Sequence, residues 1–205
     1  CYLFSLIGKD KNGEIIRDKL ENLKIDNFLI EDERPTITKI RVIGEHQHIV
    51  RVDIEKVEPL KEDIEKKIIN KIESVLKSSD VIAISDYGKG FCTPNIVKNI
   101  IEIANRNGVP VVIDPKGYDW EKYRNSYLIT PNVKEISDVL GREVENNDED
   151  IQKAGIEIMK RFNIKKLIIT RSEKGMTFFD GLKEIYHIPT EAKEVFDVSG
   201  AGDTV

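Results

Sequence analysis

Cysteine is scarce in this 205-residue sequence: there are only two, Cys1 and Cys92, and they lie far apart. They can form neither a disulfide framework nor a CxxC pair, which fits a protein of the reducing cytoplasm. No apolar run approaches the roughly 18 residues that a membrane-spanning helix needs, and no signal peptide opens the chain. The sequence therefore predicts a cytoplasmic protein without a membrane partner.

An excess of basic charge is also missing. Asp and Glu outnumber Lys and Arg by 37 to 32, which leaves a formal net charge of −5. This balance argues against a surface that binds nucleic acid. With 40% hydrophobic and 34% charged residues, the composition is that of a globular domain with a real core rather than of a disordered chain.

The two ends of the sequence suggest that the domain is incomplete. The chain begins with Cys1 in the apolar run "CYLFSLIG" and stops at "FDVSGAGDTV", where a helix is expected to start. Both ends look like cuts through a fold. We therefore expect residues 1–205 to form one partial domain whose N- and C-terminal parts are missing, and expect these residues alone to have little or no catalytic activity.

Short apolar runs alternate with amphipathic stretches along the chain. We expect strands at 2–8, 27–31, 80–88, 109–117, 126–132 and 165–172, a closing hairpin at 175–189, and helices at 12–24, 61–78, 93–108, 133–141 and 149–163. The helix at 93–108 has Thr93 as its expected cap, Pro94 at its first position and Gly108 as its stop. Strands that alternate with helices predict an α/β fold with a parallel sheet covered on both faces.

The segments 35–43 and 48–55 show a different pattern, in which apolar residues occupy every second position. This period predicts a hairpin. Val50, Val52 and Ile54 share one face of its second strand. A hairpin with one apolar face suits a lid or an interface better than the centre of a sheet.

Polar turns follow four of the expected parallel strands. They are "SDYGKG" (85–90), "DPKG" (114–117), "TPNVKE" (130–135) and "TRSEKG" (170–175). Each alone would be an ordinary turn, because Asp, Asn, Pro and Gly are turn residues. Ligands bind at the carboxyl ends of parallel strands, so four such turns together predict a functional site.

The last turn, Gly200-Ala201-Gly202-Asp203, combines two glycines with an acid. Converging backbone N–H groups and a helix N-terminus would bind a phosphate. A carboxylate beside that site makes sense if Asp203 accepts the proton of a hydroxyl that attacks phosphorus. Taken alone, a helix cap at Asp203 is the alternative. The turn fits neither a Walker A loop nor a dinucleotide fingerprint.

The sequence "DVSGAGDTV" resembles the C-terminal signature of the ribokinase-like sugar kinases, the PfkB family. The segments "RPTITKIRVI", "IVRVDIE", "SDYGKG", "VPVVIDPKG", "ITPNVKE" and "TRSEKGM" precede it in the order found in the heptose-7-phosphate kinases of ADP-heptose synthesis. The resemblance implies a ribokinase-like three-layer sandwich with a mostly parallel central sheet and a small β-hairpin lid at about 35–55. The family's sugar-contacting "GGxxxN" stretch is absent and would lie before residue 1.

The resemblance also implies roles for individual residues. Asp203 would deprotonate the anomeric hydroxyl of D-glycero-β-D-manno-heptose 7-phosphate, which attacks the γ-phosphate of ATP. Gly200, Ala201 and Gly202 would hold the transferring phosphoryl group. The cofactors would be ATP and Mg²⁺, with Glu135 at the metal and the nucleotide contacted by Asn132, Val133, Lys134, Glu135, Thr170, Gly175 and Lys116. The hairpin would serve as a lid and as the contact of a homodimer.

Other polar residues have two open interpretations. Arg34, Lys39 and Arg41 could meet the sugar 7-phosphate or a partner subunit, or be solvated, and Lys89 could bind phosphate or be a loop lysine. Asp86 and Asp114 could act in the site or cap backbone groups. The expectations for the remaining side chains are packing for Trp120 and Tyr123, a structural role for His187, a solvated turn for His46 and His48, and a buried thiol for Cys92.

Two alternatives to the heptose kinase stay open. The first is another sugar kinase of the same family, such as a phosphofructokinase or a ribokinase, with the same chemistry and a different acceptor. The second is a ribokinase-fold module that binds a sugar or nucleotide without catalysis. Asp203 and the "NVKE" run argue against the second, because a binding module needs no base.

Overall fold

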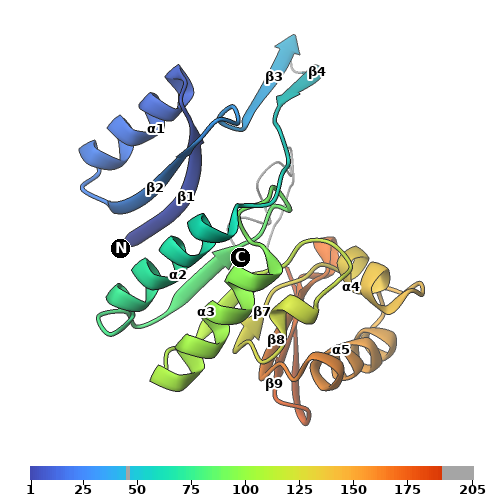
Figure 1. Cartoon of the computed structure of the whole chain (residues 1–205). Helices are drawn as coiled ribbons and strands as arrows, with labels where there is room; N and C mark the ends of the chain where they lie inside the picture. The colour runs from blue at the N-terminus through green and yellow to red at the C-terminus, as the bar shows by residue number, and fades with distance from the viewer. Residues whose placement is uncertain (45–46, 191–205) are drawn as a thin grey trace. The chain divides into compact units, whose positions relative to one another are not determined.

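The computed structural model describes residues 1–44 and 47–190. The chain forms two compact units. The first contains residues 1–62 together with 89–91, and the second contains residues 63–88 and the described chain from residue 92 onward. Figure 1 traces the chain through both units.

The first unit opens with a strand–helix–strand motif. Strand β1 (Tyr2–Gly8) pairs in parallel with β2 (Asp26–Asp32), and α1 (Lys11–Asn22) connects them. The antiparallel hairpin of β3 (Thr38–Gly44) and β4 (Gln47–Ile54) follows, so the predicted hairpin is confirmed (Figure 1). Its register shifts between Val42 and Ile43.

The apolar face predicted for α1 is only partly buried. Leu20 is 8% exposed, whereas Ile15 is 42% and Leu23 68% exposed. Within this unit, α1 packs on a sheet of only two strands. Such a narrow sheet cannot cover the full width of an amphipathic helix.

Asp10 fastens the turn after β1 to the chain that enters the hairpin. Its carboxylate caps α1 by accepting from the backbone N–H of Gly13 at 2.9 Å and also accepts from the N–H of Thr36 at 2.7 Å. The Thr36 hydroxyl accepts in turn from Gly8 N–H at 2.8 Å. The backbone hydrogen bonds from Thr36 and Gly13 lower the pKa of Asp10. A β-carbon on Gly13 would lie 2.3 Å from the Gly8 carbonyl oxygen, so this turn requires glycine there.

The second unit contains a six-stranded sheet with the order β10-β9-β8-β7-β6-β5. Strands β5 to β8 are parallel, and β9 and β10 close the sheet as an antiparallel hairpin. This confirms the predicted α/β fold with a mostly parallel sheet. The elements in chain order are α2 (Glu62–Leu76), β5 (Ile82–Ser85), α3 (Pro94–Asn107), β6 (Val111–Asp114), the 3₁₀ turn η1 (Glu121–Tyr123), β7 (Leu128–Ile129), α4 (Val133–Leu140), α5 (Asp148–Phe162), β8 (Lys166–Thr170), the 3₁₀ turn η2 (Ser172–Lys174), β9 (Met176–Asp180) and β10 (Glu184–Ile188).

Helix α3 begins and ends where its sequence predicts. The Thr93 hydroxyl accepts from Ile96 N–H, Pro94 occupies the first turn, and Gly108 ends the helix with φ of 71°. That left-handed conformation favours glycine. In contrast, β7 spans only two residues and is shorter than predicted.

The core of the second unit is built from branched apolar side chains of its helices and of its sheet strands. Burying each one fully contributes about 1.5–3 kcal/mol. Trp120 and Tyr123 are both 0% exposed, so their predicted packing role is confirmed. The fully buried aliphatic residues of the sheet and helices include Ile68, Val97, Val111, Ile113, Ile129, Ile136, Ile151, Ile158, Leu167 and Ile169.

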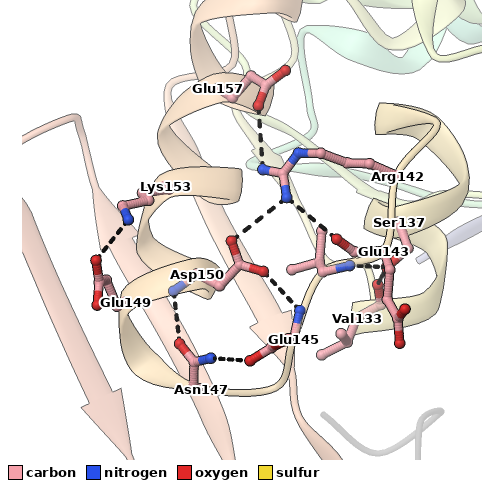
Figure 2. Close-up of polar contacts among 11 residues, drawn as sticks. Val133, Ser137, Arg142, Glu143, Glu145, Asn147, Glu149, Asp150, Lys153 and Glu157 are labelled. Carbon is pink, nitrogen blue, oxygen red and sulfur yellow. Dashed lines mark hydrogen bonds and ion pairs between the residues drawn. The ribbon is translucent and has the colours of Figure 1, made fainter.

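A polar cluster joins α4 to α5 (Figure 2). The Ser137 hydroxyl of α4 accepts from the backbone N–H of Val144 at 3.1 Å. Arg142 lies 3.5 Å from Asp150 of α5, and Asn147 caps α5 by accepting from the Asp150 N–H at 2.9 Å. These contacts set the position of α4, whose first turn carries Glu135. No helix among the described residues is long and apolar enough to cross a bilayer.

Candidate active site

The four predicted polar turns gather at one edge of the sheet. β5 pairs with β6, β6 with β7 and β7 with β8, all in parallel, so their carboxyl ends point the same way. Residues 85–88, 114–117, 130–135 and 170–175 follow these strands or end them. Tertiary structure thus brings together segments that are up to 90 residues apart in the chain. This is the edge at which parallel sheets bind ligands.

Asn132 and Glu135 form a reciprocal capping box at the start of α4. The Asn132 side chain accepts from Glu135 N–H at 2.9 Å, and the Glu135 carboxylate accepts from Asn132 N–H at 3.1 Å. Asn132 is therefore the N-cap of α4, and its nucleotide contact stays a prediction. Val133 and Lys134 are the first two residues of the helix, and Lys134 is exposed.

Lys116 reaches Glu135 from the neighbouring loop. Its ammonium lies 3.2 Å from a Glu135 carboxylate oxygen, and the side chains of Lys116 and Glu135 are 55% and 15% exposed. An ion pair this exposed contributes about 1 kcal/mol at most. Phosphate oxygens or a metal ion can therefore replace it at little cost. Two residues predicted separately for nucleotide binding thus lie side by side.

Thr170 and Gly175 bound the loop that follows β8. Thr170 N–H donates to the Pro131 carbonyl at 2.9 Å, and Thr170 forms a parallel bridge with Asn132. Gly175 has φ of 78°, and a β-carbon on it would lie 2.1 Å from the Ile188 carbonyl oxygen. The backbone therefore requires glycine at 175. The nucleotide contacts of both residues remain predictions.

Arg171 is a residue that sequence reasoning missed. It is 3% exposed and donates to Asp148 at 2.6 Å and to Asn146 at 2.9 Å. Its hydrogen bond lowers the pKa of Asp148. His187 Nδ1 lies 2.9 Å from Thr177 Oγ1 and 3.3 Å from Arg171, which supports its structural role. An arginine in a polar loop gives no sequence signal of burial, because its partners come from other elements.

Asp86 is committed to internal contacts. It is 3% exposed, and one carboxylate oxygen lies 2.6 Å from the Lys122 ammonium and 2.7 Å from the Tyr123 hydroxyl. The other accepts from Gly88 N–H at 2.7 Å. The Gly88 contact is the backbone capping that was one of its two possible roles, and a role in the site stays a prediction. Lys122 was not singled out from sequence, and a separation of 36 residues hides this pair.

Cys92 lies beside this cluster. It is half-buried rather than fully buried. Burial first, and then the Asp86 carboxylate, raises the pKa of its thiol to about 12. A thiol with that pKa is protonated at neutral pH and a poor nucleophile.

The first unit has its own small cavity near the base of the hairpin, lined by both charged and apolar residues. Arg34, Lys56 and Lys89 line it together with Asp32, Thr36 and the apolar residues Leu6, Ile7, Pro35 and Ile37. Arg34 is 6% exposed and donates to Asp32 at 2.8 Å and to the Glu58 carbonyl. Lys89 lies 2.5 Å from Glu55. Both cations therefore have internal partners.

The predicted catalytic turn lies outside the described residues. This applies to Gly200, Ala201, Gly202 and Asp203 alike. Their roles remain predictions, as does the solvated turn at His46 and His48.

The oxygen ligands at the sheet edge fit a hard cation whose remaining ligands are water and substrate phosphates. Within residues 1–44 and 47–190, no three His, Cys, Asp or Glu side chains lie close enough together to hold a metal ion. Glu135 offers one carboxylate there, an oxygen ligand of the type that Mg²⁺ prefers. Mg²⁺ usually completes its shell with water and substrate phosphates, so a single carboxylate is compatible with it.

Solved structures support the fold class. The tetrameric inhibited form of phosphofructokinase-2 from Escherichia coli superposes with a TM-score of 0.78 at 18% identity, covering 99% of this chain and 66% of that chain. Ribokinase from Giardia lamblia gives 0.77 at 18% identity, covering 98% and 63%. At this identity the likeness shows the fold alone. The fold is ribokinase-like, as predicted.

Sequence comparisons define the family. The model of the pfkB family of carbohydrate kinases matches residues 1–205. The bifunctional protein HldE of Haemophilus influenzae strain PittEE is 45% identical over 99% of this chain, and that of Nitratiruptor sp. is 40% identical over 99%. The chain belongs to the pfkB family of carbohydrate kinases. It spans 42% of the length of these two relatives.

Proposed function

We propose that the chain is part of an ATP-dependent kinase that converts D-glycero-β-D-manno-heptose 7-phosphate into the 1,7-bisphosphate, a step toward ADP-heptose and the lipopolysaccharide core. The observation that carries the proposal is the sheet edge where Lys116, Asn132 and Glu135 meet in a chain of the pfkB family. The similarity to HldE proteins favours the heptose branch. We place the reaction in the cytoplasm, where ATP is available and free thiols such as Cys92 stay reduced.

In the proposed mechanism, Asp203 accepts the proton of the anomeric hydroxyl. The anomeric oxygen forms a bond to the γ-phosphorus of ATP as the bond from that phosphorus to the β–γ bridging oxygen breaks, and ADP leaves. The backbone N–H groups of Gly200, Ala201 and Gly202 stabilise the charge on the transferring group. The proton remains on the Asp203 carboxyl until solvent removes it.

The described residues would handle the nucleotide. Lys116 would hold a phosphate once its exposed ion pair with Glu135 opens. Glu135 would then face the metal, with Asn132 keeping the carboxylate at the helix N-terminus. When bound, Mg²⁺ would neutralise the phosphate charge. The nucleotide contacts would be completed by the first turn of α4, at Val133 and Lys134, and by the two ends of the loop after β8, at Thr170 and Gly175.

The sugar phosphate would approach the small cavity of the first unit. Three cations, Arg34, Lys56 and Lys89, line it together with Asp32, Thr36 and four apolar side chains. A sugar presents hydroxyls and C–H faces together, so a wall of both kinds fits it. Arg34 and Lys89 are already held in place by internal partners. The phosphate would therefore meet these cations where they stand, without a movement of a buried side chain.

The hairpin would also join two copies of the chain. Its apolar face is exposed: Ile40, Val42, Val50, Val52 and Ile54 are 42–50% exposed. Cross-strand pairs Ile40–Val52 and Val42–Val50 place these side chains on one face. A contiguous apolar face of this kind is typical of an interface, and two identical hairpins can cover each other by two-fold symmetry.

The test is a comparison of acceptors with the complete protein. ATP-dependent phosphorylation is measured with the heptose 7-phosphate, fructose 6-phosphate and ribose, for the wild type and for Asp203→Asn. We expect a large kcat/KM preference for the heptose, and expect the variant to lower kcat by roughly 10³-fold or more while ATP still binds.

The outcomes separate the parts of the proposal. Preference for another sugar would keep the mechanism and discard the heptose. Unchanged turnover in Asp203→Asn would remove the proposed base. No transfer to any of the three acceptors would favour a binding module.

A further inference from the structure

A single buried hydroxyl connects two of the loops at the sheet edge. Tyr123 is 0% exposed. Its hydroxyl lies 2.7 Å from the Asp86 carboxylate, after β5, and accepts from the backbone N–H of Lys116, after β6, at 3.0 Å. Ring packing explains the burial of Tyr123 but not why a hydroxyl stands at its tip.

The direction of these hydrogen bonds is determined by the surrounding charges. The same Asp86 carboxylate oxygen accepts from the Lys122 ammonium at 2.6 Å and from the Tyr123 hydroxyl, so the hydroxyl donates to Asp86. Burial raises the pKa of the Tyr123 phenol, which therefore keeps its proton. The hydroxyl lone pairs are then available to the Lys116 N–H. The Lys116 carbonyl lies 3.3 Å away, a longer contact than the one to Asp86.

Lys116 is thus held at two points. Tyr123 fixes its backbone, and Glu135 meets its ammonium at 3.2 Å. Gly88, which Asp86 also binds, packs close by: a β-carbon on it would lie 3.6 Å from Lys116 Cγ. The aliphatic part of the Lys116 side chain therefore extends from a fixed backbone. It lies next to the Gly88 loop, which is hydrogen-bonded to the same Asp86 carboxylate as Tyr123.

We propose that Tyr123 is a positioning residue for Lys116, which sets the direction from which the lysine ammonium meets the nucleotide phosphates. This inference rests on the proposed function, because it assumes that Lys116 binds the nucleotide. Tyr123→Phe keeps the ring contact with Trp120, whose ring centroid lies 6.3 Å from that of Tyr123, but it leaves the Lys116 N–H without its acceptor. The loop that carries Lys116 then moves more freely, and the lysine ammonium is no longer held in one direction.

The experiment compares Tyr123→Phe with Tyr127→Phe in the complete protein. Tyr127 directly precedes β7, at the amino end of the sheet strands, and its variant loses the same hydroxyl away from the site. The equilibrium Kd of Mg·ATP is measured by calorimetry, and amide exchange is followed at Lys116. We expect Tyr123→Phe to raise the Kd about fivefold to tenfold and to speed exchange at least about tenfold, as expected for one lost hydrogen bond. Tyr127→Phe should change neither.

A double-mutant cycle separates positioning from general loosening. In a Lys116→Met background, Tyr123→Phe should no longer raise the Kd of Mg·ATP, because the ammonium that Tyr123 positions is absent. The KM for the heptose should stay within about twofold in Tyr123→Phe. If Tyr123→Phe is too unstable to assay, Asp86→Asn keeps an acceptor for the hydroxyl and should show a smaller loss that also disappears in the Lys116→Met background.

Each outcome decides a different claim. An equal loss with and without Lys116, a change in melting temperature alone, or unchanged exchange at Lys116 would overturn the positioning role. If Lys116→Met leaves the Kd of Mg·ATP unchanged, the proposed role of Lys116 fails, and the inference about Tyr123 fails with it. If Lys116→Met weakens nucleotide binding and Tyr123→Phe does not, only the inference fails.

Discussion

Single side chains in this protein hold together segments that are distant in sequence. Asp10 accepts from the N–H groups of Gly13 and Thr36 and so joins the start of α1 to the base of the hairpin. Asp86 does the same at the sheet edge for Lys122 and Tyr123. In both places one carboxylate accepts from donors in different segments, Gly13 and Thr36 for Asp10, and Gly88 and the η1 residues for Asp86, and a buried or half-buried carboxylate needs such partners.

Asp10 leads to a prediction about pH. Its pKa is lowered in the folded state by the Thr36 and Gly13 N–H groups, so its stabilising effect is full above the ordinary Asp pKa of about 4 and is lost as the pH falls through the lowered folded value. We expect Asp10→Asn to lower the melting temperature by roughly 2–4 °C at pH 7. Thermal melts from pH 7 to 3 should show this difference shrinking below about pH 4.

The control for this prediction is Asp18→Asn, which changes an exposed carboxylate within α1. It should leave the melting temperature almost unchanged across the range. A difference between wild type and Asp10→Asn that stays constant down to pH 3 would contradict the role of charge at Asp10.

At the scale of elements, α4 combines a structural task with a predicted nucleotide- and metal-binding task in one turn. Asn132 and Glu135 satisfy each other's backbone N–H groups, and the same carboxylate meets Lys116. The cluster of Figure 2 holds the other end of the helix to α5 through Ser137 and Arg142. The carboxylate of Glu135 is therefore placed before any ligand arrives.

Substitutions in the capping box should separate its two tasks. Asn132→Ala removes the cap and should cost about 1 kcal/mol of stability, or roughly 2–4 °C in melting temperature. Asn132→Asp keeps an acceptor and should cost much less. Glu135→Gln should keep most of the stability but raise the Mg²⁺ concentration needed for half-maximal turnover. Thermal melts and metal titrations of the three variants check this. Equal melting temperatures for Asn132→Ala and Asn132→Asp would contradict it.

At the scale of the whole chain, the fold is shared much more widely than the sequence. Phosphofructokinase-2 and ribokinase superpose at TM-scores of 0.78 and 0.77 with only 18% identity. A parallel sheet with apolar strands tolerates many sequences as long as pattern and volume are kept. The β3–β4 hairpin, in contrast, forms a sheet of only these two strands within the described residues. The apolar residues on one of its faces are exposed.

The hairpin face leads to a prediction about assembly. Val52→Asp puts a charge among Ile40, Val50 and Ile54 and should weaken dimerisation of the complete protein by about 100-fold in Kd, because the carboxylate would be desolvated. Arg51→Gln alters the opposite face and should leave the dimer intact. Sedimentation equilibrium measures both. A wild type that stays monomeric at high concentration, or equal dissociation by both variants, would contradict the interface.

Much of the fold and part of the site can be predicted from the residues alone. Period and capping signals placed the helices, strands and hairpins, because those signals are local: Thr93, Pro94 and Gly108 mark α3. The four polar turns could be assigned to one edge because parallel strands end on the same side. Motifs also indicated the family.

Only tertiary structure decided which polar groups pair. Nothing local shows that Tyr123 bridges Asp86 and Lys116, that Arg171 is buried against Asn146 and Asp148, or that six strands form one sheet while β1 and β2 form another. Most of these contacts join residues more than 20 positions apart in the chain, such as Tyr123 with Asp86 and Arg171 with Asn146. Whether a charge is solvated or buried depends on which elements pack around it, and the physical reason is that burial and pairing energies arise from neighbours in space rather than in sequence.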